Sequence, residues 1–454
     1  MEKNIKTIEE INEKIKRGKA VVVTADMMSE IVEELGAKEA AKKIDVVTTG
    51  TFGAMCSSGA ILNFGHTDPP MKMTEVYLNN VPAYGYLAAV DVFIGAAQPS
   101  TTKSIQYGGA HLIEDLVAGK KINFLAYGSP TDCYPGKQIQ SVITIDDVNQ
   151  AILINPRNAY QRYNAATNSS KRTLYTYMGM LIPNFGNVKY STSGSLSPLI
   201  NDPDYETIGI GTRIFLGGGI GYIIGEGTQH NPGTQFGTLM VKGDLKQMNS
   251  KYLKGATFKG YGTSLFVGIG IPIPILNEGL AKKTAIKNEN IMVNIIDYSI
   301  PKLDRPVVKQ VSYKELLSGF VEINGKKVKA SPNTSLRISK EIANELKSWI
   351  ENGKFLLTEP IERLPIERKF KQFKVNKEKL LLREENIQIQ NKTLKNKINK
   401  DENLCIDCGA CISVCPVDAL YFDETYTLQI DYNLCTKCEI CTKICVRGAL
   451  ALGD

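Results

Sequence analysis

Short apolar runs alternate with amphipathic, helix-like segments through the first 150 residues. The strand-like runs are Val21–Ala25, Asp45–Thr49, Val90–Ala97 and Ile122–Tyr127. Short apolar strands between helices are typical of parallel βαβ units. The pattern therefore predicts an α/β catalytic body with parallel βαβ units.

The remaining patterns are more varied. Isoleucines 5, 8, 11 and 15 fall on one helical face, which predicts a helix packed on the body surface. Residues 155–205 are rich in Asn, Tyr and Ser and predict little regular structure, whereas the glycine- and β-branched-rich stretch 207–275 predicts strands with tight turns. Residues 301–365 predict a small α+β segment whose clearest helix is Ser339–Asn352.

Composition is that of a globular protein. The chain has 454 residues, of which 43% are hydrophobic and 22% charged, enough for two to three domains. The longest apolar runs are 12 residues and contain Gly or Pro, too short for a membrane span. The charged N-terminus does not resemble a signal peptide, so we expect a cytoplasmic protein.

Charge and cysteine content divide the chain. Residues 367–403 hold 11 Lys/Arg against 6 Asp/Glu, and eight of the ten cysteines follow them. We therefore expect a catalytic body over 1–366, a basic linker or helical arm over 367–403, and a separate module over 404–454. The net charge of +7 is spread thinly, so nucleic acid is not an expected partner.

The C-terminal cysteines form two similar runs. Cys405, Cys408, Cys411, Cys415 and Pro416 have the C-x2-C-x2-C-x3-C-P spacing of bacterial ferredoxins, and the run recurs 30 residues later at Cys435, Cys438, Cys441 and Cys445. In such modules three thiolates hold one cluster and the fourth reaches the other. This assigns one [4Fe-4S] cluster to Cys405, Cys408, Cys411 and Cys445, and the other to Cys435, Cys438, Cys441 and Cys415. We expect a small α+β ferredoxin-like domain.

Two features qualify that assignment. Val446 follows Cys445 where proline is usual, which leaves the ligands intact. A pair of zinc sites is the alternative, because C-x2-C pairs also suit tetrahedral zinc. A two-cluster module holds two electrons and needs an external low-potential donor, so the body is expected to carry out a two-electron reduction or open a disulfide.

Only two cysteines lie in the body, and both lie in turn-like sequence. Cys56 is within Gly50–Gly59 and Cys133 is within Tyr127–Lys137, each a few residues beyond a predicted strand. Ligand sites in α/β sheets gather beyond the carboxyl ends of strands. Lys137 and loop amides would favour a nucleophilic thiolate at Cys133, while Asp132 would oppose it. We interpret both cysteines as catalytic candidates; a structural role is the alternative.

Several passages resemble a known family, the homocysteine-biosynthesis enzymes of anaerobic microbes, or L-aspartate semialdehyde sulfurtransferases. They are GTFGAMCSSGAILNFGHTDPP, YGSPTDCYPGK, NPRNAYQRYNAATN and GTRIFLGGGIGYIIGEGTQHNP. The resemblance covers about residues 1–365 and implies synthesis of homocysteine from aspartate semialdehyde, a sulfur source and reducing equivalents. It also implies that Cys133 carries a persulfide and that Cys56 is the second essential thiol.

A mechanism follows from this resemblance. Converting R–CHO and sulfide into R–CH2–SH requires two electrons, the number that two clusters supply. The terminal sulfur of a Cys133 persulfide would attack the aldehyde, and electrons would reduce either the adduct or a Cys56–Cys133 disulfide. The alternatives are a ferredoxin-linked sulfur-trafficking or assembly protein and a ferredoxin-dependent disulfide reductase.

Other candidates are weaker. The stretch Gly217–Gly225 suggests a dinucleotide site, but no helix is expected after it, so a nest of N–H groups for a carboxylate or plain strand turns are the better interpretations. His66 and His230 are candidate proton donors to the aldehyde oxygen. Arg157, Arg162 and Arg213 are candidates for pairing with a substrate carboxylate. An oligomer is compatible with the sequence.

Overall fold

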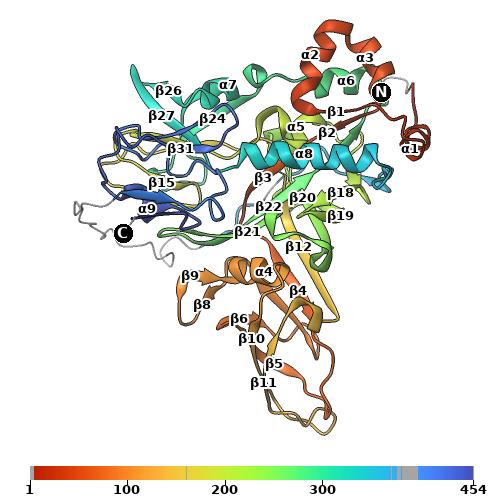
Figure 1. Cartoon of the computed structure of the whole chain (residues 1–454), viewed down its shortest axis with the longest axis vertical. Helices are drawn as coiled ribbons and strands as arrows, with labels where there is room; N and C mark the ends of the chain where they lie inside the picture. The colour runs from red at the N-terminus through yellow and green to blue at the C-terminus, as the bar shows by residue number, and fades with distance from the viewer. Residues whose placement is uncertain (1–4, 160, 370, 376–379, 381–396, 453–454) are drawn as a thin grey trace.

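The computed structural model describes residues 5–159, 161–369, 371–375, 380 and 397–452. A large sheet-rich body carries a small C-terminal domain, drawn in blue, packed against one side (Figure 1). No helix in these ranges is long and apolar enough to cross a membrane. Most of the expected linker, 367–403, lies outside the described residues.

One antiparallel sheet organises the body. Within the described ranges it has 13 strands, in the order β11-β10-β5-β6-β7-β4-β12-β20-β19-β18-β22-β21, with β3 also paired to β22. Each pairing along it is antiparallel. The strands are β3 (Thr51–Met55), β4 (Gly59–Asn63), β5 (Met73–Leu78), β6 (Val81–Tyr84), β7 (Asp91–Gly95), β10 (Ile122–Gly128), β11 (Gln138–Ile143), β12 (Gln150–Asn158), β18 (Arg213–Leu216), β19 (Gly219–Glu226), β20 (Leu239–Asp244), β21 (Leu253–Phe258) and β22 (Gly262–Gly270).

The predicted α/β body of parallel βαβ units is not confirmed. The stretches Val90–Ala97 and Ile122–Tyr127 become β7 and β10, whose neighbours are antiparallel. Buried and outward-facing residues alternate along β10. This pattern is typical of an antiparallel strand with one face on the core and the other exposed to solvent. Parallel pairing in the described ranges is limited to short pairs: β1 (Val22–Thr24) with β2 (Val46–Thr48), and two pairs in a smaller mixed sheet. The other neighbour of β2, β23 (Pro272–Pro274), is antiparallel to it.

Smaller sheets complete the fold. A six-stranded mixed sheet has the order β25-β24-β13-β16-β27-β26 in the described ranges. Its strands are β13 (Ala165–Thr167), β16 (Asn187–Tyr190), β24 (Met292–Asp297), β25 (Val307–Ser312), β26 (Phe320–Ile323) and β27 (Lys326–Pro332). Two-stranded pairs are β8 (Pro99–Ser100) with β9 (Ser104–Gly108), β14 (Leu174–Thr176) with β15 (Gly179–Leu181), β17 (Gly209–Ile210) with β28 (Glu362–Arg363), β29 (Ile398–Lys400) with β32 (Leu450–Leu452), and β30 (Leu420–Phe422) with β31 (Leu428–Ile430). Residues 155–205 therefore hold more short strands than their composition predicts.

The helices are α1 (Ile8–Lys16), α2 (Ala25–Leu35), α3 (Ala37–Lys43), α4 (Gly109–Val117), α5 (Pro198–Asn201), α6 (Glu278–Thr284), α7 (Tyr313–Leu317), α8 (Leu336–Glu351) and α9 (Ile440–Ile444). Helices α4 and α8 pack on strands of the central sheet, whereas α2, α3 and α6 pack on one another. The two amphipathic predictions hold: α1 buries Ile8, Ile11 and Ile15 but leaves Ile5 exposed, and α8 matches the helix predicted at 339–352. Because α8 packs on β3 and β22, it fixes the strand that leads to Cys56.

An ion pair and apolar packing join the C-terminal domain to the body. Arg447 donates from both terminal nitrogens to the Glu114 carboxylate of α4, at 2.5 and 2.9 Å. Burial works to raise the pKa of Glu114, but the hydrogen bonds and charges of Arg447 and Lys254 outweigh it and hold that pKa below its ordinary value. The carboxylate is therefore ionised and paired near neutral pH.

Apolar side chains of the domain extend the body's core. Ile406, Ala410 and Val446 belong to one buried cluster with aromatic residues of β3, β21 and β22. The backbone N–H of Thr257 in the edge strand β21 donates to the carbonyl of Val446 at 2.8 Å, so a main-chain hydrogen bond ties the domain to the sheet. These contacts fix one face of the domain against the body.

We expect Arg447→Met to weaken this junction strongly. Removing one partner of a buried ion pair costs about 3–5 kcal/mol when the other charge is left unpaired. Glu114 keeps Lys254 at 3.0 Å, so we expect a smaller loss, about 2–3 kcal/mol. Arg368→Met is a matched control, because Arg368 pairs with Glu226 at the surface and such pairs are worth about 1 kcal/mol or less. Denaturant unfolding followed by protein fluorescence measures both changes; equal effects would contradict the role given to Arg447.

Candidate active site

Cys56 lies at the end of β3, in the turn that leads to β4. Its side chain is exposed and free, and the Tyr261 hydroxyl donates to its Sγ at 3.6 Å. Tyr261 belongs to the β21–β22 turn, and its ring lies 5.9 Å from that of Tyr177. Tyr177 in turn shares a hydroxyl hydrogen bond with Tyr298. Of these three tyrosines only Tyr177 belongs to the Tyr-rich stretch 155–205, and the contact of the cluster with Cys56 was not predicted from the sequence.

A hydroxyl-lined cavity lies behind this turn. It has a volume of about 330 Å³. Its lining residues are Thr51, Gly53, Ala54, Met55, Ala159, Ser191, Thr192, Ser197 and Thr334. The Oγ1 atom of Thr192 is buried and finds no hydrogen-bond partner among the described residues. A Cβ on Gly53 would lie 3.3 Å from the Thr334 hydroxyl, so glycine there keeps the cavity open.

Cys133 lies in the loop of the β10–β11 hairpin. Thr131 and Tyr134 close the loop with two backbone hydrogen bonds of 3.0 and 3.1 Å. The Cys133 Sγ is exposed and lies 3.5 Å from the Thr131 hydroxyl. The Tyr134 ring stacks on His66 with 5.9 Å between centroids. The thiol is thus presented on an ordered surface loop.

The two thiols are not brought together in the described structure. The turn with Cys56 precedes β4, whereas His66, which contacts the Cys133 loop, lies beyond the other end of β4. That strand alone spans about 13 Å. In the predicted parallel sheet both loops would share one edge; the antiparallel strands place them at opposite ends instead.

The histidine and arginine candidates differ in their surroundings. His66 is exposed beside the Cys133 loop. His230 is buried, and both ring nitrogens contact backbone groups, of Thr238 and Pro365, as in a structural histidine. Arg157 lies next to the Cys56 turn: Ser57 donates to its carbonyl at 3.4 Å, and its Nε donates to Thr228.

The other two arginines point elsewhere. Arg213 lies over the Phe355 ring at 4.9 Å, and Arg162 donates to Gln235 at 2.7 Å. Gly217 and Gly218 form the turn between β18 and β19, with φ of 60° and 90°. A strand follows them, and the Gly217 N–H already donates to Gly268, so this stretch behaves as a strand turn.

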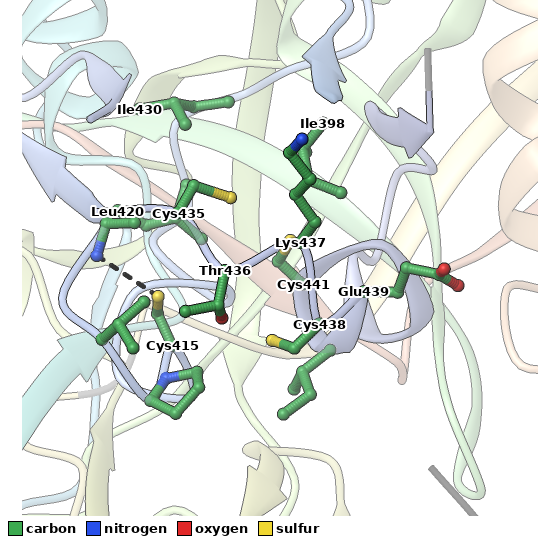
Figure 2. A pocket seen from close by; sticks show the side chains of 14 residues that line it. Ile398, Cys415, Leu420, Ile430, Cys435, Thr436, Lys437, Cys438, Glu439 and Cys441 are labelled. Atoms are coloured by element: carbon green, nitrogen blue, oxygen red, sulfur yellow. Dashed lines mark hydrogen bonds between the residues drawn. The ribbon is translucent and has the colours of Figure 1, made fainter. Parts of the chain in front are cut away.

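The eight C-terminal cysteines line two separate cavities. Cys415, Cys435, Cys438 and Cys441 surround one of about 360 Å³ (Figure 2). The other, of about 320 Å³, is lined by Cys405, Cys408, Cys411 and Cys445. Each cavity therefore takes three thiols from one run and the fourth from the other, the arrangement that the spacing predicts.

The surroundings of the thiols suit iron–sulfur groups. The backbone N–H of Ala419 donates to Cys415 Sγ at 3.3 Å, and that of Ala449 donates to Cys445 Sγ at 3.2 Å. Amide hydrogen bonds to ligand sulfurs are a feature of such centres. Burial holds the pKa of the Cys411 thiol well above its ordinary value, so a thiolate there needs the positive charge of a metal group.

The two cavities face different surroundings. The loop Ile406–Ala410 is mostly buried against the body, whereas Tyr432, Leu434, Thr436 and Lys437 around the other cavity are exposed. The cavity of Cys405 and Cys445 is thus on the body side, and the cavity of Cys415 and Cys435 is open to an outside partner.

Comparison with known proteins agrees with this architecture. Residues 20–357 match the family model described as homocysteine biosynthesis enzyme, sulfur-incorporation, and residues 404–449 match a 4Fe-4S dicluster domain. This chain belongs to the homocysteine biosynthesis enzyme family. It is an enzyme with a fused iron–sulfur domain of the ferredoxin type.

Two relatives are named L-aspartate semialdehyde sulfurtransferase. That of Methanosarcina acetivorans is 58% identical over 81% of this chain and 74% of the relative, and that of Methanocaldococcus jannaschii is 59% identical over 79% and 73%. A 61-residue stretch is 62% identical to the L-aspartate semialdehyde sulfurtransferase iron-sulfur subunit of M. acetivorans, covering 13% of this chain and 47% of that protein. No solved structure matches the chain.

We expect Cys415→Ala to lose one cluster and keep the other. Cys415 lines the cavity of the second run, so its removal opens that site while the four thiols of the body-side cavity remain. Iron and acid-labile sulfide should fall to about half, with sulfur-to-iron charge-transfer absorption retained. Cys56→Ala is the control and should keep both clusters. Loss of all iron from Cys415→Ala, or zinc in place of iron, would contradict the assignment.

Proposed function

We propose that this enzyme converts L-aspartate semialdehyde to L-homocysteine by reductive sulfur transfer. In this proposal Cys133 carries sulfur as a persulfide, Cys56 is the thiol at the site of reduction, and the C-terminal domain holds two [4Fe-4S] clusters. The identity of the substrate in this proposal is taken from the names of the two relatives. The different roles proposed for Cys133 and Cys56 rest on the position of each thiol relative to the C-terminal domain.

Cys56 is the thiol connected to that domain. Val446, next to Cys445, accepts a hydrogen bond from Thr257 of β21; β21 pairs with β22, and β22 pairs with β3. The end of β3 is therefore three inter-strand spacings from Val446, a distance of about 14 Å. A path of this length through packed protein supports direct electron transfer. Cys133, beyond the far end of β4, has no such connection.

The chemistry balances with this arrangement. In the overall reaction an aldehyde, R–CHO, combines with hydrogen sulfide, two electrons and two protons to give the thiol R–CH2–SH and water. When bound, the clusters supply electrons one at a time. Sulfur in a persulfide is more oxidised than sulfide by one electron pair, so Cys133 is loaded by a donor whose sulfur is already at this level, such as a low-molecular-weight persulfide, and the thiol of that donor is released. Starting from the Cys133 persulfide, one homocysteine consumes two electron pairs, which the clusters supply in two successive loads.

The residues around Cys56 suit the aldehyde step. The hydroxyl-lined cavity behind the turn supplies hydrogen bonds to an aldehyde oxygen, including the unpartnered Thr192 Oγ1. Arg157, beside the same turn, supplies positive charge for a carboxylate. His66 stacks on Tyr134 of the Cys133 loop, which supports a role for it in loading sulfur rather than in the aldehyde step.

Sulfur must still cross from Cys133 to Cys56. The sheet that carries the Cys133 hairpin continues through β4, β12 and β20 into the body by unbroken pairing, so closing the gap within one chain would require breaking that sheet. We therefore propose that the exposed Cys133 loop of one copy delivers sulfur to Cys56 of another. A disulfide reductase that cycles a Cys56–Cys133 pair within one chain is disfavoured for the same reason.

Paired variants test this proposal. Cys133→Ser should form no persulfide and lose homocysteine synthesis by about 10³-fold or more. Cys56→Ser should still load a persulfide on Cys133 but make no homocysteine. A mixture of the two should regain synthesis, because each supplies the thiol that the other lacks. The measurements are anaerobic product analysis with aspartate semialdehyde, a low-molecular-weight persulfide and a low-potential reductant, and mass spectrometry of the loop peptide from protein loaded before the reductant is added.

Ser129→Ala, an exposed change in the Cys133 loop, is the control and should remain active. Wild-type synthesis by Cys133→Ser would overturn the persulfide role. An inactive mixture of correctly folded, cluster-loaded variants would overturn delivery between copies. Persulfide formation without any product from wild-type protein would instead support a sulfur-trafficking protein.

A further inference from the structure

Lys189 of β16 is a body residue whose ammonium group lies in the interface with the C-terminal domain. Its side chain is 0% exposed. The Nζ donates to the Ser331 hydroxyl at 2.7 Å, to the Ala410 carbonyl at 3.1 Å and to the Gly409 carbonyl at 3.4 Å. Gly409 and Ala410 lie between Cys408 and Cys411 and line the body-side cavity. A cation of the body is therefore fixed against one cysteine loop.

This ammonium forms no ion pair within the described part of the chain. A buried charge without a counter-charge is strongly unfavourable. A second body lysine that reaches the domain, Lys329, donates to the Cys415 carbonyl and pairs with the partly exposed Asp418. Lys189 has only neutral partners in these ranges. An anionic group in the adjacent cavity would supply the missing counter-charge, and an iron–sulfur cluster held by four thiolates is anionic.

The other cavity has a buried group of opposite sign. Glu439 lines the cavity of Cys415, Cys435, Cys438 and Cys441, and it is only 9% exposed. Its Oε1 finds no hydrogen-bond partner among the described residues. Glu439 is 30 residues after Gly409, at the equivalent position of the second run. One cavity therefore has a buried lysine beside it and the other a buried glutamate.

We propose that Lys189 and Glu439 are positioning residues that separate the reduction potentials of the two clusters. Lys189 raises the potential of the cluster of Cys405, Cys408, Cys411 and Cys445, and Glu439 lowers that of the other. This inference rests on the cluster assignment proposed above and goes beyond it, because it gives electrons a direction, from the exposed side to the body side.

Fixed charges beside a cluster change its reduction potential. Reduction adds one electron, and hence one negative charge, to a cluster, and no covalent bond forms or breaks. A fixed positive charge in a low-dielectric interface stabilises the added charge, and a fixed negative charge opposes it. The electron comes from an external one-electron donor of low potential and accumulates next to β21 and the path to Cys56.

Redox titration of the reconstituted full chain tests this inference. In Lys189→Met, the ratio of reduced to oxidised body-side cluster at a fixed potential should fall at least tenfold, equivalent to about 59 mV for one electron. Lys189→Arg keeps the charge and should stay near wild type. Glu439→Gln should raise the potential of the other cluster. Electron paramagnetic resonance follows each cluster, and the Cys415→Ala background isolates the body-side signal.

Lys329→Met is the matched control, because it removes a lysine that is already paired with a carboxylate, and the body-side potential should not change. Ser331→Ala keeps the Lys189 charge and tests whether packing alone matters; it should also leave that potential unchanged. If Lys189→Met does not fold, Lys189→Gln removes the charge and keeps a donor group. Unchanged potentials in a cluster-loaded neutral variant, or equal shifts of both clusters, would overturn the inference. No substrate is present, so failure of the proposed activity would not affect the result.

Discussion

Contacts with the edge strand β21 fix the C-terminal domain beside the central sheet and set where each thiol lies relative to it. Val446 accepts a hydrogen bond from Thr257 of β21, β21 pairs with β22, and β22 pairs with β3, which leads to Cys56. Helix α8 covers these strands, and the Arg447–Glu114 pair locks the domain in place beside them. One thiol is thereby held at a fixed short distance from the iron–sulfur domain. The same sheet holds the other thiol away from it.

Because Cys133 and Cys56 are far apart, the two thiols have different surroundings. Cys133 is on an exposed loop, where a sulfur donor can reach it, beside His66 and Tyr134. Cys56 is beside a hydroxyl-lined cavity and a tyrosine cluster, on the side of the body that carries the iron–sulfur domain. In the proposed mechanism, loading sulfur at a distance from the reductant protects the persulfide from premature reduction. The proposed roles of the buried charges beside the two cysteine cavities give the electrons a direction in the same mechanism.

The sequence predicted local features better than it predicted the arrangement of the body. Cysteine spacing predicted the grouping of thiols in both cavities, because ligand geometry restricts that spacing, and isoleucine periodicity predicted α1. The parallel sheet was not found, since apolar runs such as Ile122–Tyr127 do not specify the direction of their neighbours. The alternating outward positions of Asn123 and Tyr127 were the available signal.

Residues that act through distant contacts could not be found from sequence. Lys189 contacts a loop more than 200 residues away, and Tyr261 reaches Cys56 across 205 positions. Both depend on strand register, which is set by the packing of the whole sheet. His230 was proposed as a proton donor because its loop resembles a motif, and its two backbone contacts became visible only in the folded chain.

Single-turnover reaction of the pre-reduced protein tests the central claim most directly. Protein loaded with two electrons and no excess reductant is mixed anaerobically with aspartate semialdehyde and a low-molecular-weight persulfide, while cluster absorption and homocysteine are followed together. We expect one homocysteine for every two electron pairs lost, with cluster reoxidation and product formation at the same rate. Homocysteine formed while the clusters remain reduced, or formed equally well by cluster-free protein, would contradict it.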